Sequence, residues 1–177
     1  MASVEDHIEA ARAARADDRP ADARRHAKLA LQDAHADQPI SLINALKTMG
    51  QIERDEGHLE AALAHYLRAA DLCRDQSDPL LLAHTIRHVG DIHWDMGDAD
   101  LAEPCFEEAL AFYRENAPSP GELANALRPL ALLKEAAGDK AAAYDLWREA
   151  GDLYAAAGID AGAQESARRL TALSASP

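Results

Sequence analysis

The strongest constraint on this chain is a step of 40 or 41 residues that several different residues share. One set of markers consists of the glycines Gly57, Gly97 and Gly138. The same step separates the prolines Pro39, Pro79 and Pro120, and also the small residues Gly50, Gly90 and Ala131. A fixed period of roughly 20–50 residues is the signature of an array in which each unit packs against its neighbours. We therefore expect stacked copies of one structural unit.

Each unit is expected to hold two helices. The first begins at a capping residue followed by proline, as at Asp78 and Ser119. A side-chain oxygen there accepts a bond from a free amide, and proline fits the first turn. The helix ends at the marker glycine, which tolerates a left-handed backbone. The second helix begins almost at once, near Leu59 or Asp100, and so short a connection makes the pair antiparallel.

The second helices share a small–large–small pattern with offsets of four and three residues. Its copies are Ala62, Tyr66 and Ala69, then Ala102, Phe106 and Ala109, then Ala143, Trp147 and Ala150. These offsets place all three residues on one helix face. The small residues admit the partner helix, and the ring fills the space between them. The chain holds 41 alanines and only 8 aromatic residues, a composition typical of closely packed helices.

These residues resemble the pattern of the tetratricopeptide repeat family, W-x2-L-G-x2-Y followed by A-x3-F. The segment Ala102-Glu103-Pro104 is similar to a branch of that family with longer units. The resemblance implies an all-α solenoid of antiparallel helix pairs, wound as a right-handed superhelix of about nine helices. The chain departs from the family at the late tyrosine of the first helix, which is replaced by Glu53, His93 and Lys134.

The repeats divide residues 1–177 into a single array. A degenerate first unit covers 3–36, where Asp18 stands in place of the marker glycine. Three full units follow at 39–76, 79–116 and 120–157. Residues 160–174 are predicted to form an amphipathic capping helix that covers the last unit with Leu170 and Leu173. A solenoid needs such terminal caps.

The resemblance implies that the first helices line a concave groove. The candidate binding residues facing it are Asn44, Lys47, Gln51, Arg54, His84, Arg87, His88, Asp91, Trp94, Asn125 and Arg128. Lys47, Arg87 and Arg128 occupy equivalent positions, and such cations are suited to gripping carboxylates. In the competing interpretation, carboxylates of neighbouring turns already pair with them, as surface ions commonly do. Those carboxylates are Asp55, Asp91 and Glu135.

Two features of the helix after Pro79 admit more than one interpretation. His84 and His88 form a His-x3-His pair of the kind that ligates metals. The groove register explains their common face equally well, and we predict no metal site. Trp94 is either an exposed anchor for a partner or a local cation–π contact of a neighbouring arginine.

The sequence contains no glycine-rich phosphate loop, no G-x-S-x-G elbow and no cysteine with a histidine in a nucleophile setting. We therefore predict no catalytic residue, no enzyme activity and no cofactor. The expected function is an interaction scaffold whose groove binds a protein or peptide. Acidic or C-terminal carboxylate groups are a candidate ligand chemistry. A self-assembling structural module and a ligand-sensing module of a larger complex are the alternatives.

The formal net charge of −13 disfavours binding to nucleic acid or to an anionic membrane. The first residues show no basic segment followed by an apolar run. No uncharged apolar run reaches the roughly 20 residues that cross a bilayer. We therefore expect a cytoplasmic protein that is a monomer, with a homo-oligomer as the alternative. The sequence leaves open the identity of the partner and whether the groove or the convex face receives it.

Overall fold

The computed structural model describes residues 2–35, 37–116 and 119–175. Within these ranges the chain forms nine α-helices and no strand, which confirms the all-α prediction. The helices are α1 (Val4–Ala16), α2 (Pro20–Asp33), α3 (Pro39–Asp55), α4 (Leu59–Arg74), α5 (Pro79–Asp95), α6 (Ala99–Glu115), α7 (Pro120–Ala136), α8 (Lys140–Ala156) and α9 (Asp160–Ala175).

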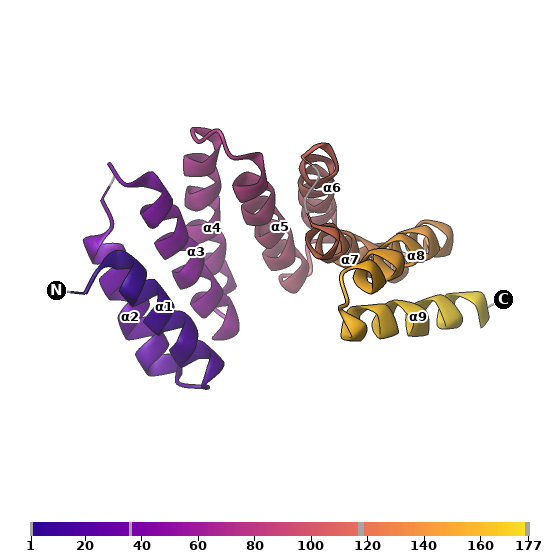
Figure 1. Cartoon of the computed structure of the whole chain (residues 1–177), viewed down its shortest axis with the longest axis horizontal. Helices are drawn as coiled ribbons and strands as arrows, with labels where there is room; N and C mark the ends of the chain where they lie inside the picture. The colour runs from indigo at the N-terminus through magenta and orange to yellow at the C-terminus, as the bar shows by residue number, and fades with distance from the viewer. Residues whose placement is uncertain (1, 36, 117–118, 176–177) are drawn as a thin grey trace.

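The helices stack as antiparallel pairs along one axis (Figure 1). α1 packs against α2, α3 against α4, α5 against α6, and α7 against α8. Successive pairs meet through α2 and α3, α4 and α5, and α6 and α7, while α9 packs on α8. The two termini lie at opposite ends of the array. This open stack is the solenoid that the repeat period predicts.

The turns between paired helices depend on one left-handed residue each. Gly57, Gly97 and Gly138 have φ angles of 80°, 85° and 79°, in a region that a residue with a Cβ rarely adopts. Asp18 takes the same role in the first pair with φ of 55°. Aspartate tolerates this conformation better than most side chains. Asp18 therefore occupies, in the turn between α1 and α2, the backbone conformation that the glycines occupy in the later turns.

The predicted caps form at the starts of α5 and α7. The carboxylate of Asp78 accepts a hydrogen bond from the Leu81 backbone N–H at 3.0 Å. Ser119 and Glu122 form a capping box, in which each side chain accepts a bond from the other's backbone N–H. Pro129 lies inside α7 without ending the helix.

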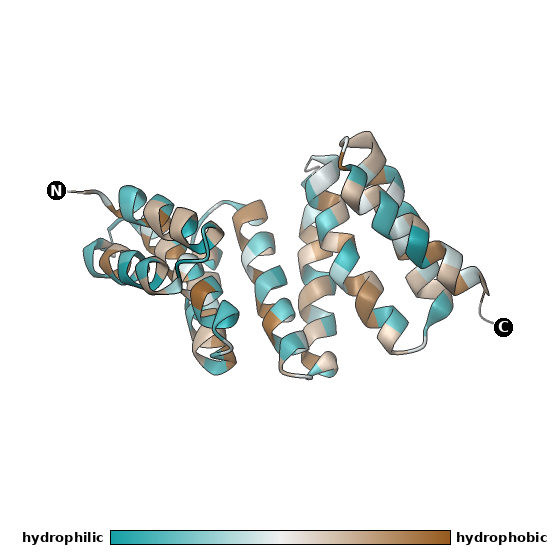
Figure 2. Cartoon of the chain, turned by 90° about the horizontal axis from the view of Figure 1, so that it is seen from below, coloured by the Kyte–Doolittle hydropathy of each residue, from teal (hydrophilic) through white to brown (hydrophobic). Residues whose placement is uncertain are grey.

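The core lies between the two helices of each pair and between successive pairs. Tyr66, Phe106 and Trp147 are at most 2% exposed. A Cβ atom added to Gly50 would lie 2.7 Å from the Tyr66 ring, and one added to Gly90 would lie 2.7 Å from the Phe106 ring. Close approach of the paired helices therefore requires these glycines. Polar and apolar residues intermix along every helix (Figure 2), and in the described part none is both long and apolar enough to cross a membrane.

Helix α9 closes the C-terminal end of the described array. Its Gly162 approaches the Tyr154 ring of α8 so closely that an added Cβ would lie 2.5 Å from the ring. Leu170 and Leu173 are partly buried against the core of the last pair. Arg169 lies over the Trp147 ring, with 5.8 Å between its guanidinium carbon and the ring centroid.

Candidate functional site

The first helices of successive pairs line two neighbouring hollows, which we call hollow 1 and hollow 2. Hollow 1 has a volume of about 360 Å³ and is lined by Ala11, Arg12, Arg15, Lys47, Thr48, Gln51, Ile52, Tyr66, His84 and His88. Hollow 2 has a volume of about 310 Å³ and is lined by Arg54, Arg87, Asp91, Asn125, Arg128 and Pro129. Together they bring nine of the eleven predicted groove residues to two adjoining sites.

Asn44 and Trp94 line neither hollow. The backbone carbonyl of Asn44 accepts a hydrogen bond from the Thr48 hydroxyl at 2.8 Å. Trp94 lies near the C-terminal end of α5, where it lines a separate hollow of about 410 Å³ with the ends of α6 and α7. Its ring packs partly buried against the core cluster of the next pair, because contact with apolar neighbours removes ring area from water. Among the described residues it forms no cation–π contact with an arginine.

The three equivalent cations have three different environments. Arg87 lies 3.1 Å from Asp91, one turn along the same helix. Arg128 donates two hydrogen bonds to Glu165 of α9, at 2.7 and 3.0 Å. The competing interpretation therefore holds for Arg87, while Arg128 has a different carboxylate from the one expected. Lys47 has no ion pair or hydrogen bond in the described part of the chain.

Lys47 is consequently the least neutralised charge among the predicted groove residues. Burial, together with the positive charges of Arg12 and Arg87, lowers the pKa of Lys47 to about 8. Lysine normally titrates near 10.5, so the site disfavours its charged form as it stands. An anion beside the ammonium group would reverse this effect.

Asp91 is the centre of the ion pairs in hollow 2. Its carboxylate lies 3.1 Å from Arg87, 3.1 Å from His88 Nδ1 and 3.6 Å from Arg54. Burial alone would raise the pKa of Asp91, but the hydrogen bond from His88 and the nearby cations outweigh it and hold the pKa below its ordinary value. Arg54 also contacts Asp95 at 2.5 Å. Hollow 2 is therefore rich in charge but largely balanced.

The histidines of α5 form an aromatic stack with Tyr66. The rings of His84 and His88 meet edge to face with centroids 4.7 Å apart, and His88 stacks on Tyr66 at 5.1 Å. Burial lowers the pKa of His84 to about 3, so its ring is neutral at physiological pH. Its Nδ1 atom is buried and has no hydrogen-bond partner in the described ranges. Across residues 2–35, 37–116 and 119–175, no three His, Cys, Asp or Glu side chains converge to hold a metal ion.

Two groove residues lie outside the sequence prediction. Arg12 and Arg15 of α1 line hollow 1, and Arg15 forms an ion pair with Asp55. Counted back from Asp18, they stand at the positions that Gln51 and Arg54 occupy before Gly57. The 39-residue step would have identified them, had the degenerate first unit been assigned a share of the groove.

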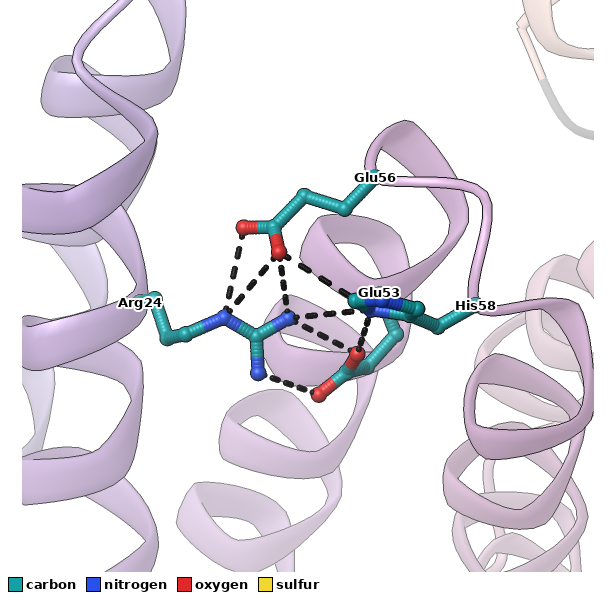
Figure 3. Close-up of polar contacts among 4 residues, drawn as sticks. All are labelled: Arg24, Glu53, Glu56 and His58. Carbon is teal, nitrogen blue, oxygen red and sulfur yellow. Dashed lines mark hydrogen bonds and ion pairs between the residues drawn. The ribbon is translucent and has the colours of Figure 1, made fainter.

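A charged cluster of Arg24, Glu53, Glu56 and His58 joins the first two pairs (Figure 3). Arg24 of α2 lies 2.6 Å from Glu53 and 2.7 Å from Glu56, and His58 Nδ1 lies 2.8 Å from Glu53. Glu53 is buried, with 8% of its surface exposed. The bonds from Arg24 lower the pKa of Glu53 to about 2 although burial opposes this shift.

At the equivalent position two units later, the cation and the carboxylate have exchanged helices. There Lys134 forms an ion pair with Glu103, so the cation lies on the first helix and the carboxylate on the second. Both pairs stand where the family's late tyrosine is missing. Each of these ion pairs joins two successive helix pairs.

Comparison with known proteins supports this description of the fold. Residues 41–115 match the family model described as tetratricopeptide repeat. No curated protein matches the sequence. The matched segment is thus similar to tetratricopeptide repeats, and the helices on either side of it continue the same stacked-pair architecture.

Solved structures share the fold at low sequence identity. The apo form of RapI superposes with a TM-score of 0.79 at 13% identity, over 88% of this chain and 57% of that one. A Rap protein complexed with competence and sporulation factor gives 0.82 at 18%, over 96% and 51%. A putative kinesin light chain from Podospora anserina with nearly identical repeats gives 0.72 at 14%, over 97% and 95%. The chain thus spans little more than half the length of the two Rap structures.

Proposed function

We propose that this protein is a non-catalytic interaction scaffold, and that a peptide or protein segment binds along hollows 1 and 2. The observation that carries the proposal is the partly buried Lys47, a cation without a partner among the described residues that lines a hollow formed mainly by successive first helices. An unpaired, partly buried charge lowers the stability of the fold. A protein with a purely structural role would gain nothing that offsets this loss.

The composition of the groove supports a polar, extended ligand. Asn125 keeps its side-chain amide available while its oxygen accepts a bond from Tyr154 at 2.8 Å. Amide groups of this kind pair with a peptide backbone. The Rap structure was solved in complex with competence and sporulation factor, so the fold is compatible with ligand binding. We propose acidic or C-terminal carboxylate groups as features of the partner, bound through Lys47 and the arginines of the groove.

The test measures affinity for a partner captured from an extract of the cells that make the protein. Lys47→Glu reverses the unpaired charge and is expected to weaken binding by at least about tenfold. Arg68→Glu is the matched control, since Arg68 is an exposed arginine of α4 that lines neither hollow. Equal affinities for wild type and Lys47→Glu would refute the groove as the binding surface.

Light scattering at low and high protein concentration distinguishes the interaction scaffold from the self-assembling alternative. A monomer at both concentrations supports the scaffold. Concentration-dependent growth that Lys47→Glu does not change would favour assembly through another face.

A further inference from the structure

Hollow 1 carries an imbalance of charge that the paired groups around it do not remove. Arg12, Arg15 and Lys47 line it, whereas none of the described lining residues is an aspartate or glutamate. The chain as a whole has a formal net charge of −13. A cavity that gathers cations and omits carboxylates on such an acidic protein is suited to an anion.

Most hydrogen-bond donors of the hollow are already committed. Arg15 pairs with Asp55, and the Gln51 side-chain amide donates to the same carboxylate at 2.8 Å. The hydroxyl of Thr48 donates to a backbone carbonyl one turn earlier, and that of Tyr66 donates to Gln51 at 3.4 Å. These groups shape the wall of the hollow but have little to offer a ligand.

Two cationic side chains of the hollow remain without a partner. Arg12 and Lys47 have no ion pair or hydrogen bond within the described residues. His84 also lines the hollow, and its buried Nδ1 has no hydrogen-bond partner among the described residues. The hollow therefore presents two uncompensated positive charges.

We propose that hollow 1 binds the phosphoryl monoester group of a phosphorylated protein segment lying in the groove. A phosphoryl monoester carries a charge of about −1.5 to −2 and three acceptor oxygens, and its charge matches the two cations. A single carboxylate supplies one negative charge, so it would leave one of the two cations unneutralised. A phosphodiester also supplies only one charge per phosphate. The inference rests on the proposed function because both use the same groove, and it names a phosphoryl group in place of a carboxylate as the anion beside Lys47.

The surroundings of hollow 1 favour a polypeptide as the carrier of the phosphoryl group. A volume of about 360 Å³ admits a phosphorylated side chain, while hollow 2 extends the site along α5 and α7. There Arg87 and Arg54 are neutralised by Asp91 and Asp95. Hollow 2 thus offers polar contacts to a backbone without demanding a second anion.

The electrostatics of the empty hollow agree with this ligand. Burial lowers the pKa of Lys47 to about 8 and that of His84 to about 3. The shift of Lys47 reports positive charge held at a cost in the absence of an anion, whereas the shift of His84 leaves that ring neutral. A bound dianion would favour the charged form of each group.

Calorimetric titration of the full chain tests the inference with four probes. They are a short alanine–glycine peptide with one phosphoserine, its unphosphorylated twin, the same peptide with glutamate in place of phosphoserine, and inorganic phosphate. The phosphopeptide is expected to bind at least about tenfold more tightly than the other three, because only it combines a dianion with a backbone. Arg12→Met and Lys47→Met are each expected to reduce phosphopeptide affinity by about tenfold. Arg68→Met, the matched loss of charge outside the groove, leaves it unchanged.

The outcomes separate the parts of the inference. Equal binding of the glutamate peptide would overturn the preference for a dianion, and equal binding of inorganic phosphate would overturn the polypeptide carrier. Absence of phosphopeptide binding would overturn the phosphoryl assignment. Arg12 is exposed, so Arg12→Met remains informative if Lys47→Met misfolds. The groove itself is judged separately, by whether Lys47→Glu weakens binding of the captured partner.

Discussion

The cluster around Arg24 provides a quantitative test of how successive helix pairs are held together. Glu53 titrates near 4.5 when unperturbed and near 2 in the folded chain, chiefly because of its hydrogen bonds from Arg24. A shift of this size corresponds to about 3 kcal/mol of differential stabilisation of the carboxylate. Arg24→Met leaves Glu53 buried with His58 as its remaining partner, so we expect a loss of about 2–3 kcal/mol in the free energy of unfolding at pH 7.

The pH dependence has a definite sign. The folded pKa of Glu53 is depressed, so its contribution is fully present above about pH 4.5 and is lost as the pH falls towards 2. The difference in unfolding free energy between wild type and Arg24→Met should therefore shrink across that interval. Urea denaturation followed by circular dichroism at a series of pH values measures this difference.

Arg25→Met is the matched control for Arg24→Met. Arg25 is exposed on the same helix and pairs with the partly exposed Asp22 at 3.2 Å, so its replacement is expected to cost less than about 0.5 kcal/mol. The double variant Arg24→Met with Glu53→Leu removes both charges and should recover most of the lost stability. The reasoning would be refuted if Arg24→Met and Arg25→Met lowered the free energy of unfolding equally. It would also be refuted if the difference in that free energy between wild type and Arg24→Met did not shrink in acid.

Two further perturbations test the packing of individual pairs. Gly90→Ala places a Cβ 2.7 Å from the buried Phe106 ring, and overpacking of about 1–3 kcal/mol exceeds the helix-propensity gain of up to about 1 kcal/mol. The melting temperature should therefore fall. Adding Phe106→Leu to the Gly90→Ala chain should restore part of the lost melting temperature. A higher melting temperature for Gly90→Ala alone would contradict the close packing. Arg128→Met removes both bonds to Glu165, so amide exchange in α9 should accelerate by roughly fivefold, or about 1 kcal/mol, while α3 and α4 stay unchanged. If Arg128→Met changed amide exchange by the same factor in every helix, the ion pair of Arg128 with Glu165 would not be what holds α9 in place.

The fold was predictable because its determinants recur along the chain. The glycine turns and the small–large–small pattern repeat in register, and Asp18 could be assigned only because three glycines fixed the step. Side-chain pairing did not follow from the register. Lys47, Arg87 and Arg128 are equivalent in sequence, yet their partners lie on different helices or are missing.

The candidate site was predictable by position but not by chemistry. A register states which residues face the groove, but the charge that stays unneutralised depends on contacts between distant segments. Arg128 pairs with α9, 37 residues away, and Arg15 pairs with Asp55, 40 residues away. The register predicts that Trp94 faces the groove. It takes no account of the apolar area that a large ring removes from water by packing on the next pair.

Site-specific photo-crosslinking tests the central claim most directly, namely that a partner lies along hollows 1 and 2. Benzoylphenylalanine is introduced at Gln51 or Arg128 in the groove, and at the exposed second-helix residues Arg68 or Arg148 as matched controls. We predict crosslinks to the captured partner from the two groove positions and none from the two outer ones. Crosslinks confined to Arg68 and Arg148 would show that the partner binds the opposite surface and would contradict the account.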